Sequence, residues 1–361
     1  MQRRHFQLAL ASLLAGRLPL SDAAQPVAFA PVLPGRRLVF PADHGAHPLF
    51  RTEWWYVTGW LDRADGSSLG FQTTFFRVRT GMGEDNPSAF APSQLLLAHA
   101  AVADSQRGRL RHDQRSSRVG FGRAGFATDQ TRVWLGDWRL EQQGEGYQAR
   151  VQSADFAYDL ALQPQGPPTL NGVEGFSQKA PDPVHASHYY SRSQLAVRGT
   201  VMLSGGQENV TGRAWLDHEW SSELLPKEAQ GWDWVGLNLD DGSALMAFQL
   251  RGQGGQALWS AATLTPKTGA ARTLLPQAVG FEATRWWTSP RNAIRYPVEW
   301  TLTIGSRQLQ LRALFDDQEL DSRRSTGAIY WEGAVRVLEG KAQIGRGYLE
   351  LTGYGERIRV G

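Results

Sequence analysis

The hydrophobic pattern of the chain is that of short β-strands. From residue 54 onward, apolar runs rich in aromatic and β-branched residues are separated by turn signals such as Asp65-Gly66 and Asp241-Gly242. Convincing helical periodicity is scarce. Many short strands with turns between them predict an all-β chain built as barrels or sandwiches. The runs include WWYVTGWL (54–61), LGFQTTFFRVR (69–79), LLLAHAAVA (95–103) and RVWLGDWRL (132–140).

The strand pattern occurs twice along the chain. WWYVTGWLDRADGSSL (54–69) aligns with WDWVGLNLDDGSAL (232–245), and GRAWLD (212–217) aligns with GRGYLE (345–350). Unrelated β-sequences also resemble one another, but two matches in the same order favour duplication. We predict two tandem antiparallel β-barrels. The predicted units are a first domain over residues 24–222, a linker with Pro and Gly over 223–231, and a second domain over 232–361.

The two halves differ where the last matching strand ends. The first half continues after Asp217 with His218, Glu219 and Trp220, whereas the second half continues with Leu351-Thr352-Gly353-Tyr354. None of the eight histidines lies beyond His218. Positions on which the halves agree are expected to serve the fold, and polar residues gained by one half are expected to serve function. Acid–base chemistry that uses imidazole is therefore expected in the first half or at the junction.

Strand alternation divides these residues between two faces. Residues i and i+2 of a strand share a face, and one face of a barrel strand points into the lumen. We expect carboxyl groups among indoles in the lumen of the first barrel, where burial would raise their pKa and allow proton delivery. One face of 215–220 carries Trp215, Asp217 and Glu219, the other Leu216, His218 and Trp220; at the front of the unit, Glu53 and Trp55 oppose Trp54 and Tyr56.

Plainer explanations exist for these residues. Asp217 and Glu219 could simply pair with Arg213 or Arg51 at one end of the barrel, and the run at 54–56 could be core. The histidine pairs in HGAH (44–47) and HASH (185–188) have the spacing of metal ligands on a helix, but both lie beside prolines in apparent loops, so no metal site is predicted. The chain has no nucleotide loop, glycine fingerprint or nucleophile elbow, and no cofactor is expected.

Composition limits where the protein works. Residues 1–23 have a basic start, a short apolar run and a small-residue end, which is typical of a signal peptide, and Arg3-Arg4 suggests the Tat route over Sec. We expect a periplasmic or secreted protein with no transmembrane segment after processing. The absence of cysteine excludes disulfides and thiol chemistry. The net charge of +3, without a basic run, argues against a nucleic-acid partner.

Four segments together resemble a known family. EWWYVTGWL (53–61), RAWLDHEWSS (213–222), IYWEGAV (329–335) and YLELTGY (348–354) are similar to segments of carotenoid 1,2-hydratases and of their exported relatives, the AttH-like proteins described as predicted secreted hydrolases. The resemblance covers nearly the whole mature chain. It implies a pair of lipocalin-like barrels, in agreement with the repeat. The signal segment favours the exported branch.

The resemblance implies a cofactor-independent hydratase or hydrolase with a site for an apolar, isoprenoid or lipid-like ligand. A hydratase adds water across an isolated C=C, which requires a proton donor, an aromatic wall that tolerates a cation, and a water. As an enzyme, the protein would use Asp217 as the acid, His218 or Glu219 to orient it or activate water, and Glu53 as a second carboxyl. The wall and ligand contacts would come from Trp54, Trp55, Tyr56, Trp220 and Tyr190.

Two other functions remain open from the sequence. The protein could be a periplasmic carrier that binds a hydrophobic ligand without changing it, in association with an ABC-type transporter. It could also be a purely structural pair of barrels, which the polar difference between the halves disfavours.

Overall fold

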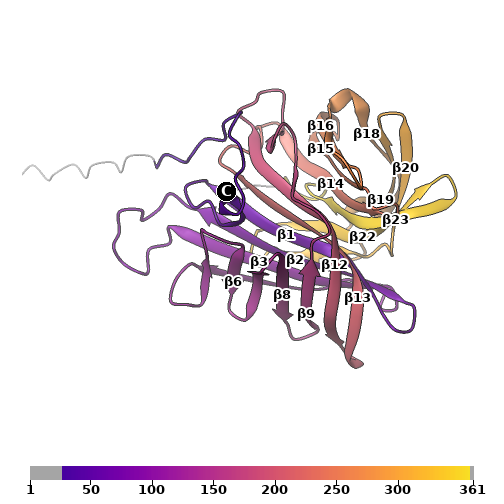
Figure 1. Cartoon of the computed structure of the whole chain (residues 1–361), viewed down its shortest axis with the longest axis horizontal. Coiled ribbons are helices and arrows are strands. Elements are labelled where there is room, and N and C mark those ends of the chain that lie inside the picture. The colour runs from indigo at the N-terminus through magenta and orange to yellow at the C-terminus, as the bar shows by residue number, and fades with distance from the viewer. Residues whose placement is uncertain (1–26, 358–361) are drawn as a thin grey trace, which may run out of the picture.

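The chain folds into two antiparallel β-sheets. The computed structural model describes residues 27–357, so the predicted signal peptide lies outside the described part. Strands of residues 52–221 form a 13-stranded sheet, and strands of residues 229–351 form a 10-stranded sheet (Figure 1). The prediction of an all-β chain with two barrel-like units is confirmed. Among the described residues, no helix is long and apolar enough to span a membrane.

The first sheet is preceded by a short 3-10 helix, η1 (Ala42–His44). Its strands are β1 (Thr52–Asp62), β2 (Ser68–Arg79), β3 (Gln94–Asp104), β4 (Arg111–Arg118), β5 (Ala124–Phe126), β6 (Arg132–Leu135), β7 (Trp138–Gln143), β8 (Gly146–Gln152), β9 (Ala157–Gln163), β10 (Thr169–Leu170), β11 (Phe176–Gln178), β12 (Ala186–Leu203) and β13 (Gly206–Ser221). The second sheet has β14 (Ala229–Leu239), β15 (Ala244–Gly252), β16 (Ala257–Thr265), β17 (Arg272–Leu274), β18 (Val279–Thr288), β19 (Arg295–Ile304), β20 (Arg307–Ala313), β21 (Glu319–Asp321), β22 (Ile329–Glu339) and β23 (Ala342–Leu351), with η2 (Pro276–Ala278) before β18.

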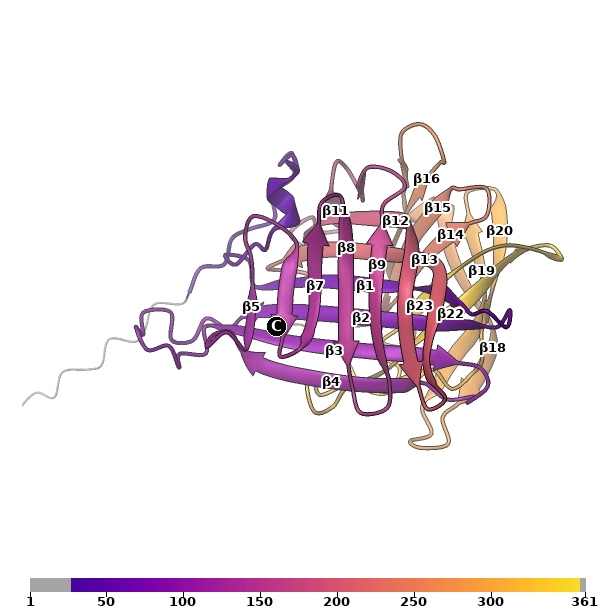
Figure 2. The ribbon, with the colours of Figure 1, turned by 60° about the horizontal axis from the view of Figure 1, so that its bottom comes forward.

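The first sheet curls into a nearly closed barrel. Strands β7–β9 cross over β1–β4 (Figure 2), and an apolar core that includes Trp55, Val57 and Leu216 fills the space between them. Arg115 on β4 helps to bridge the remaining seam, because its guanidinium donates to the carbonyl of Gln152 on β8 over 2.8 Å. The second sheet curls around its own core but does not close, since its end strands β17 and β18 do not pair within residues 27–357.

Strand order repeats between the halves. The first sheet runs β4-β3-β2-β1-β13-β12, and the second runs β17-β16-β15-β14-β23-β22. In both, the first strand of the half pairs with its own hairpin partner and with the last strand of the half. Tyr56 lies opposite Asp217 in the first sheet, and Trp234 lies opposite Glu350 in the second. The topology thus supports the duplication inferred from the sequence.

The outer face of strands β1 and β13 packs against the outer face of strands β14 and β23. An aromatic cluster lies between the sheets, with Tyr56, Trp60 and Trp215 from the first half and Trp234 and Tyr348 from the second. Trp60 donates its indole N–H to the carbonyl of Gly347 over 3.0 Å. A β-bulge in β12 turns Gln194 toward the second half, where its backbone N–H donates to Asn238 Oδ1 over 2.8 Å. These contacts hold the two halves together as one unit.

Candidate functional site

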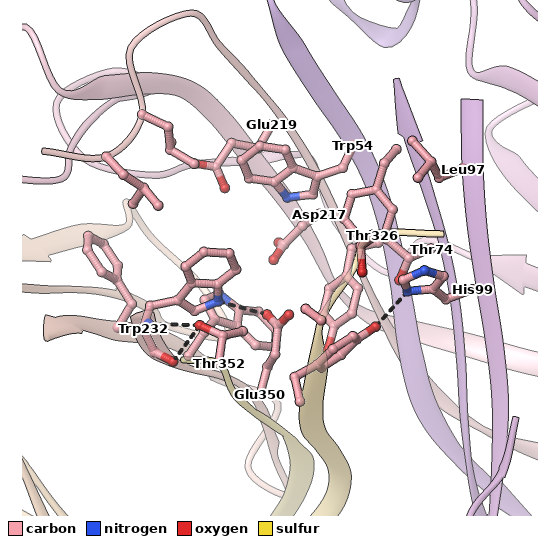
Figure 3. Close-up of a pocket in the computed structure, with 18 of the residues that line it drawn as sticks. Trp54, Thr74, Leu97, His99, Asp217, Glu219, Trp232, Thr326, Glu350 and Thr352 are labelled. Atoms are coloured by element: carbon pink, nitrogen blue, oxygen red, sulfur yellow. Dashed lines mark hydrogen bonds between the residues drawn. The ribbon is translucent and has the colours of Figure 1, made fainter. Parts of the chain in front are cut away.

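A cavity of about 350 Å³ lies between the two halves. Strands β1–β3 and β13 form one side, and β14, β15, β22 and β23 form the other (Figure 3). Leu224 and Leu225, in the segment that joins β13 to β14, complete the wall. This position corrects the expectation for Asp217 and Glu219, which face the cavity between the halves and not the interior of the first barrel. The aromatic part of the wall includes Trp54, Tyr56, Phe76, Trp232, Trp234, Phe248 and Tyr330.

Asp217 lies on the wall of this cavity. Strand alternation holds as predicted: Trp215 packs between the halves, whereas Leu216 points into the first barrel. The carboxyl of Asp217 accepts three hydrogen bonds, from Ser191 Oγ at 2.5 Å, the Tyr189 hydroxyl at 2.6 Å and Trp215 Nε1 at 2.6 Å. Burial nevertheless raises the pKa of Asp217 to about 7, against the opposing effect of these donors. The group can therefore hold or release a proton near neutral pH.

Glu219 lines the cavity one step further along β13. Its carboxylate forms an ion pair with Lys179 over 2.7 Å and accepts a hydrogen bond from Ser187. The Lys179 ammonium also lies 4.5 Å from the ring centre of Phe248. Neither Arg213 nor Arg51 is therefore needed to explain this acid, and Arg213 pairs with Asp240 instead. The arrangement makes Glu219 half of a nearly buried charge pair.

The second half contributes its own acid to the cavity. Glu350 on β23 accepts a hydrogen bond from Trp232 Nε1 over 3.1 Å, and burial raises its pKa to about 7. Glu332 lies directly across from it on β22 and is fully buried. The acids of the cavity therefore come from both halves and meet at the junction between them, whereas the end of the second repeat looked chemically bland in the sequence. The second half lacks histidines but not acids.

The repeat explains where these residues lie. The alignment that pairs Trp54 with Trp232 also pairs Asp217 with Glu350, and all four side chains line the cavity. Trp232 and Glu350 do not stand out in the sequence, because positions shared by the two halves are expected to serve the fold. Matching acids and aromatics in the two halves indicate that equivalent faces of the repeats meet at the cavity. That signal was present in the sequence.

The remaining predicted site residues lie inside the first barrel, away from Asp217. Glu53 and His218 meet there, with His218 Nε2 2.8 Å from Glu53 Oε1. His47 Nδ1 lies 2.8 Å from the same oxygen, and Arg77 Nε donates to Glu53 Oε2 over 2.8 Å. Burial opposes ionisation of Glu53, but Arg77 and the two imidazoles hold its pKa well below its usual range. Glu53 is therefore a buried carboxylate, which does not suit a proton donor.

Three of the predicted aromatic site residues lie around Glu53 and His218 inside the first barrel. Trp55 stacks on His218 with ring centres 4.9 Å apart, and Trp220 stacks on His47 at 3.6 Å. The Tyr190 hydroxyl lies 3.1 Å from His218 Nδ1. The structure thus separates Trp55, Trp220 and Tyr190 from the cavity, whereas Trp54 and Tyr56 face it.

Only one group of ring nitrogens and carboxylates within residues 27–357 has the spacing of metal ligands. The donor atoms of His47, Glu53 and His218 lie within 4.8 Å of one another. Both imidazoles already contact Glu53, and His47 Nε2 lies 2.9 Å from Asp43 Oδ1, with these carboxylates raising the pKa of His47 against burial. A metal ion here would have to displace these hydrogen bonds, and its positive charge would lie close to the positively charged Arg77 guanidinium. The cluster is better explained as a hydrogen-bonded ion network.

Comparisons with known proteins agree with this architecture. A solved structure of a Nitrosomonas europaea protein assigned to AttH is 47% identical, with a TM-score of 0.85 over 90% of this chain and 100% of that chain. Kievitone hydratase from Nectria haematococca is 12% identical, with a TM-score of 0.67 over 91% of this chain and 96% of the hydratase. CghA is 16% identical, with a TM-score of 0.56 over 92% and 96% of the two chains.

The last two similarities show a shared fold only. Comparison with curated proteins finds no match. The AttH-like family model matches residues 31–354, which includes both halves and every wall of the cavity. The chain therefore belongs to the AttH-like family.

Proposed function

We propose that the protein binds an apolar, isoprenoid or lipid-like small molecule between its two halves and adds water to it, with Asp217 as the proton donor. One observation carries this proposal. A carboxyl whose pKa is raised to about 7 by burial lies on the wall of a largely apolar cavity. A general acid works best when its pKa is near the working pH. The resemblance to hydratases points to the same reaction class.

The surroundings of Asp217 suit both of its protonation states. While protonated, it can donate to a C=C held against the wall. After donation, the carboxylate keeps the hydrogen bonds from Ser191, Tyr189 and Trp215, which stabilise its charge. The acid therefore needs no large rearrangement between the two states.

The aromatic wall suits the intermediate of such a reaction. Protonation of an isolated C=C leaves a carbocation, and the faces of indole rings attract cations. Trp54 and Trp232 flank the cavity from the two halves, close to Asp217 and Glu350 (Figure 3). Two proteins that share this fold are consistent with the proposal. One is named as a hydratase of kievitone, and the other, CghA, has been crystallised with Sch210972.

The test uses purified protein, acyclic isoprenoids and labelled water. Geranylgeraniol and squalene are incubated with the protein in ¹⁸O-water, and products are followed by mass spectrometry. We expect an ¹⁸O-labelled alcohol from the wild type and a loss of about 10²- to 10⁴-fold in Asp217→Asn, the range for a general acid. Asp240→Asn, an exposed acid on the turn after β14, is the matched control. Equal rates for the wild type and Asp217→Asn would contradict the assignment.

A non-catalytic carrier is the second candidate. It is favoured by the three hydrogen bonds that Asp217 receives from the protein itself, because these satisfy the carboxyl without a ligand. We propose that such a carrier would act in the periplasm and pass its ligand to an ABC-type transporter. Organic extraction of the exported protein separates the roles. A single unmodified ligand favours the carrier, and a compound recovered with its hydrated form favours the enzyme.

A further inference from the structure

The cavity carries one acid from each half at equivalent strand positions. Asp217 lies opposite Tyr56 on the neighbouring strand, and Glu350 lies opposite Trp234. Both carboxyl groups point into the cavity, one from β13 and the other from β23 (Figure 3). Adding water to a C=C takes two proton transfers, one to carbon and one away from the incoming water. Two separate acids on the cavity wall match that requirement.

Buried polar groups around Glu350 lack partners. Within residues 27–357, neither carboxyl oxygen of Glu332 has a partner at normal hydrogen-bond geometry, although the hydroxyls of Tyr56 and Tyr330 are its polar neighbours. The Tyr56 hydroxyl is likewise buried without such a partner. Directly paired residues on neighbouring strands share a face, so Glu332 lies beside Glu350. Several unsatisfied polar groups next to a cavity are what a bound water requires.

The charges around Glu350 leave it able to exchange a proton. Burial raises the pKa of Glu350 to about 7, and burial together with the neighbouring Glu350 raises the pKa of Glu332 further. Two adjacent buried carboxyls do not both ionise, so near neutral pH the pair keeps one proton and Glu350 gains or loses the other. The titratable groups around this pair are Asp217 and Glu219 on β13, Tyr56 on β1, Tyr330 on β22, Tyr348 on β23 and Lys179.

We infer that Glu350 is the second proton-transfer residue of the cavity, which binds the water that adds to the substrate and accepts its proton, while Glu332 and Tyr56 position that water. This inference rests on the proposed function. The Asp217 O–H bond breaks as the π pair of the C=C forms a new C–H bond. The water oxygen then bonds to the cation and one of its protons passes to Glu350. One water is added in total, and proton exchange with solvent resets both acids.

Two variants and one control test the inference. Turnover of geranylgeraniol in ¹⁸O-water is measured from pH 5 to pH 9, and binding is followed through quenching of tryptophan fluorescence. Wild-type turnover should be bell-shaped, because Glu350 must be ionised and Asp217 protonated. Glu350→Gln should bind the probe normally, lose about 10²-fold in turnover and no longer decline toward low pH. Glu339→Gln, an exposed site on β22, should match the wild type.

Glu332 is tested as a positioning residue. Because it stays protonated in the active state, Glu332→Gln should retain most turnover and the bell-shaped profile, whereas Glu332→Met should lower turnover with little change in probe binding. Full activity of Glu350→Gln at every pH, alongside an inactive Asp217→Asn, would overturn this inference and leave the proposed function intact. A wild type that binds the probe but produces no alcohol would overturn both.

Discussion

Trp234, in the second half of the chain, donates its indole N–H to the hydroxyl of Tyr189 in the first half over 3.1 Å. That hydroxyl in turn donates to Asp217 over 2.6 Å. The second half therefore helps to orient the acid of the first half, in addition to forming a wall of the cavity. The chemistry of Asp217 consequently depends on how the two halves dock.

Removing the hydroxyl of Tyr189 should raise the pKa of Asp217. The hydrogen bond favours the carboxylate, and bonds to charged groups contribute about 1.5 to 3 kcal/mol. Tyr189→Phe should therefore raise the pKa of Asp217 by about one to two units, at 1.36 kcal/mol per unit. Titration of ¹³C-labelled aspartate side chains by NMR measures the change. Trp234→Phe removes only the donor to Tyr189 and should shift the pKa of Asp217 less than Tyr189→Phe does. A larger shift in Trp234→Phe would contradict the proposed order of hydrogen bonds from Trp234 through Tyr189 to Asp217.

Asp217 should make the stability of the protein depend on pH. Its pKa is raised from 3.8 to about 7 on folding, so the folded state binds the proton more tightly than the unfolded state. Below pH 4, Asp217 lowers the free energy of unfolding very little. This destabilisation grows as the pH rises and levels off above pH 7, at roughly 4 kcal/mol. Between pH 4 and pH 8, Asp217→Asn should gain stability relative to the wild type in urea unfolding. A constant difference would show that Asp217 titrates normally.

The cluster inside the first barrel should serve stability. Arg77→Met leaves Glu53 as a buried carboxylate without its guanidinium partner, and breaking one side of a buried pair costs about 3 to 5 kcal/mol. Urea unfolding measures this loss, with the half-buried Arg307, which pairs with Glu339 at the surface, substituted by Met as a control that should change little. Where Arg77→Met remains folded, its affinity for geranylgeraniol should equal that of the wild type. A selective loss of binding would place the cluster in the ligand site.

Close packing between the halves should depend on Gly70. A Cβ atom at this position would lie 2.6 Å from the Tyr348 hydroxyl and 2.7 Å from the Ala334 side chain, both in the second half. Gly70→Ala should therefore push the halves apart, cost about 1 to 3 kcal/mol and weaken binding of geranylgeraniol. Gly280→Ala, where the nearest atom lies at 3.5 Å, is the control. Unchanged binding in Gly70→Ala would show that docking of the halves does not shape the cavity.

The sequence predicted the strands, the repeat and the two faces of 215–220, because strand alternation and turn residues are local signals. It also identified Asp217, Glu219, Trp54 and Tyr56, which the structure brings to one cavity. It did not predict that the outer face of the first barrel meets the second sheet, because positions shared by the two repeats are expected to serve the fold. Strand alternation alone places His218 on the face opposite Asp217, and the structure places Glu53 beside His218 on that face, inside the first barrel.

The central claim is that Asp217 is a protonatable acid in a ligand cavity between the two halves. The most direct test is NMR titration of ¹³C-labelled aspartate carboxyl groups, with and without geranylgeraniol, in the wild type and in Asp217→Asn. We predict one resonance that titrates near pH 7, disappears in Asp217→Asn and moves when geranylgeraniol binds. An Asp217 resonance that titrates near pH 4 and does not respond to the ligand would contradict the account.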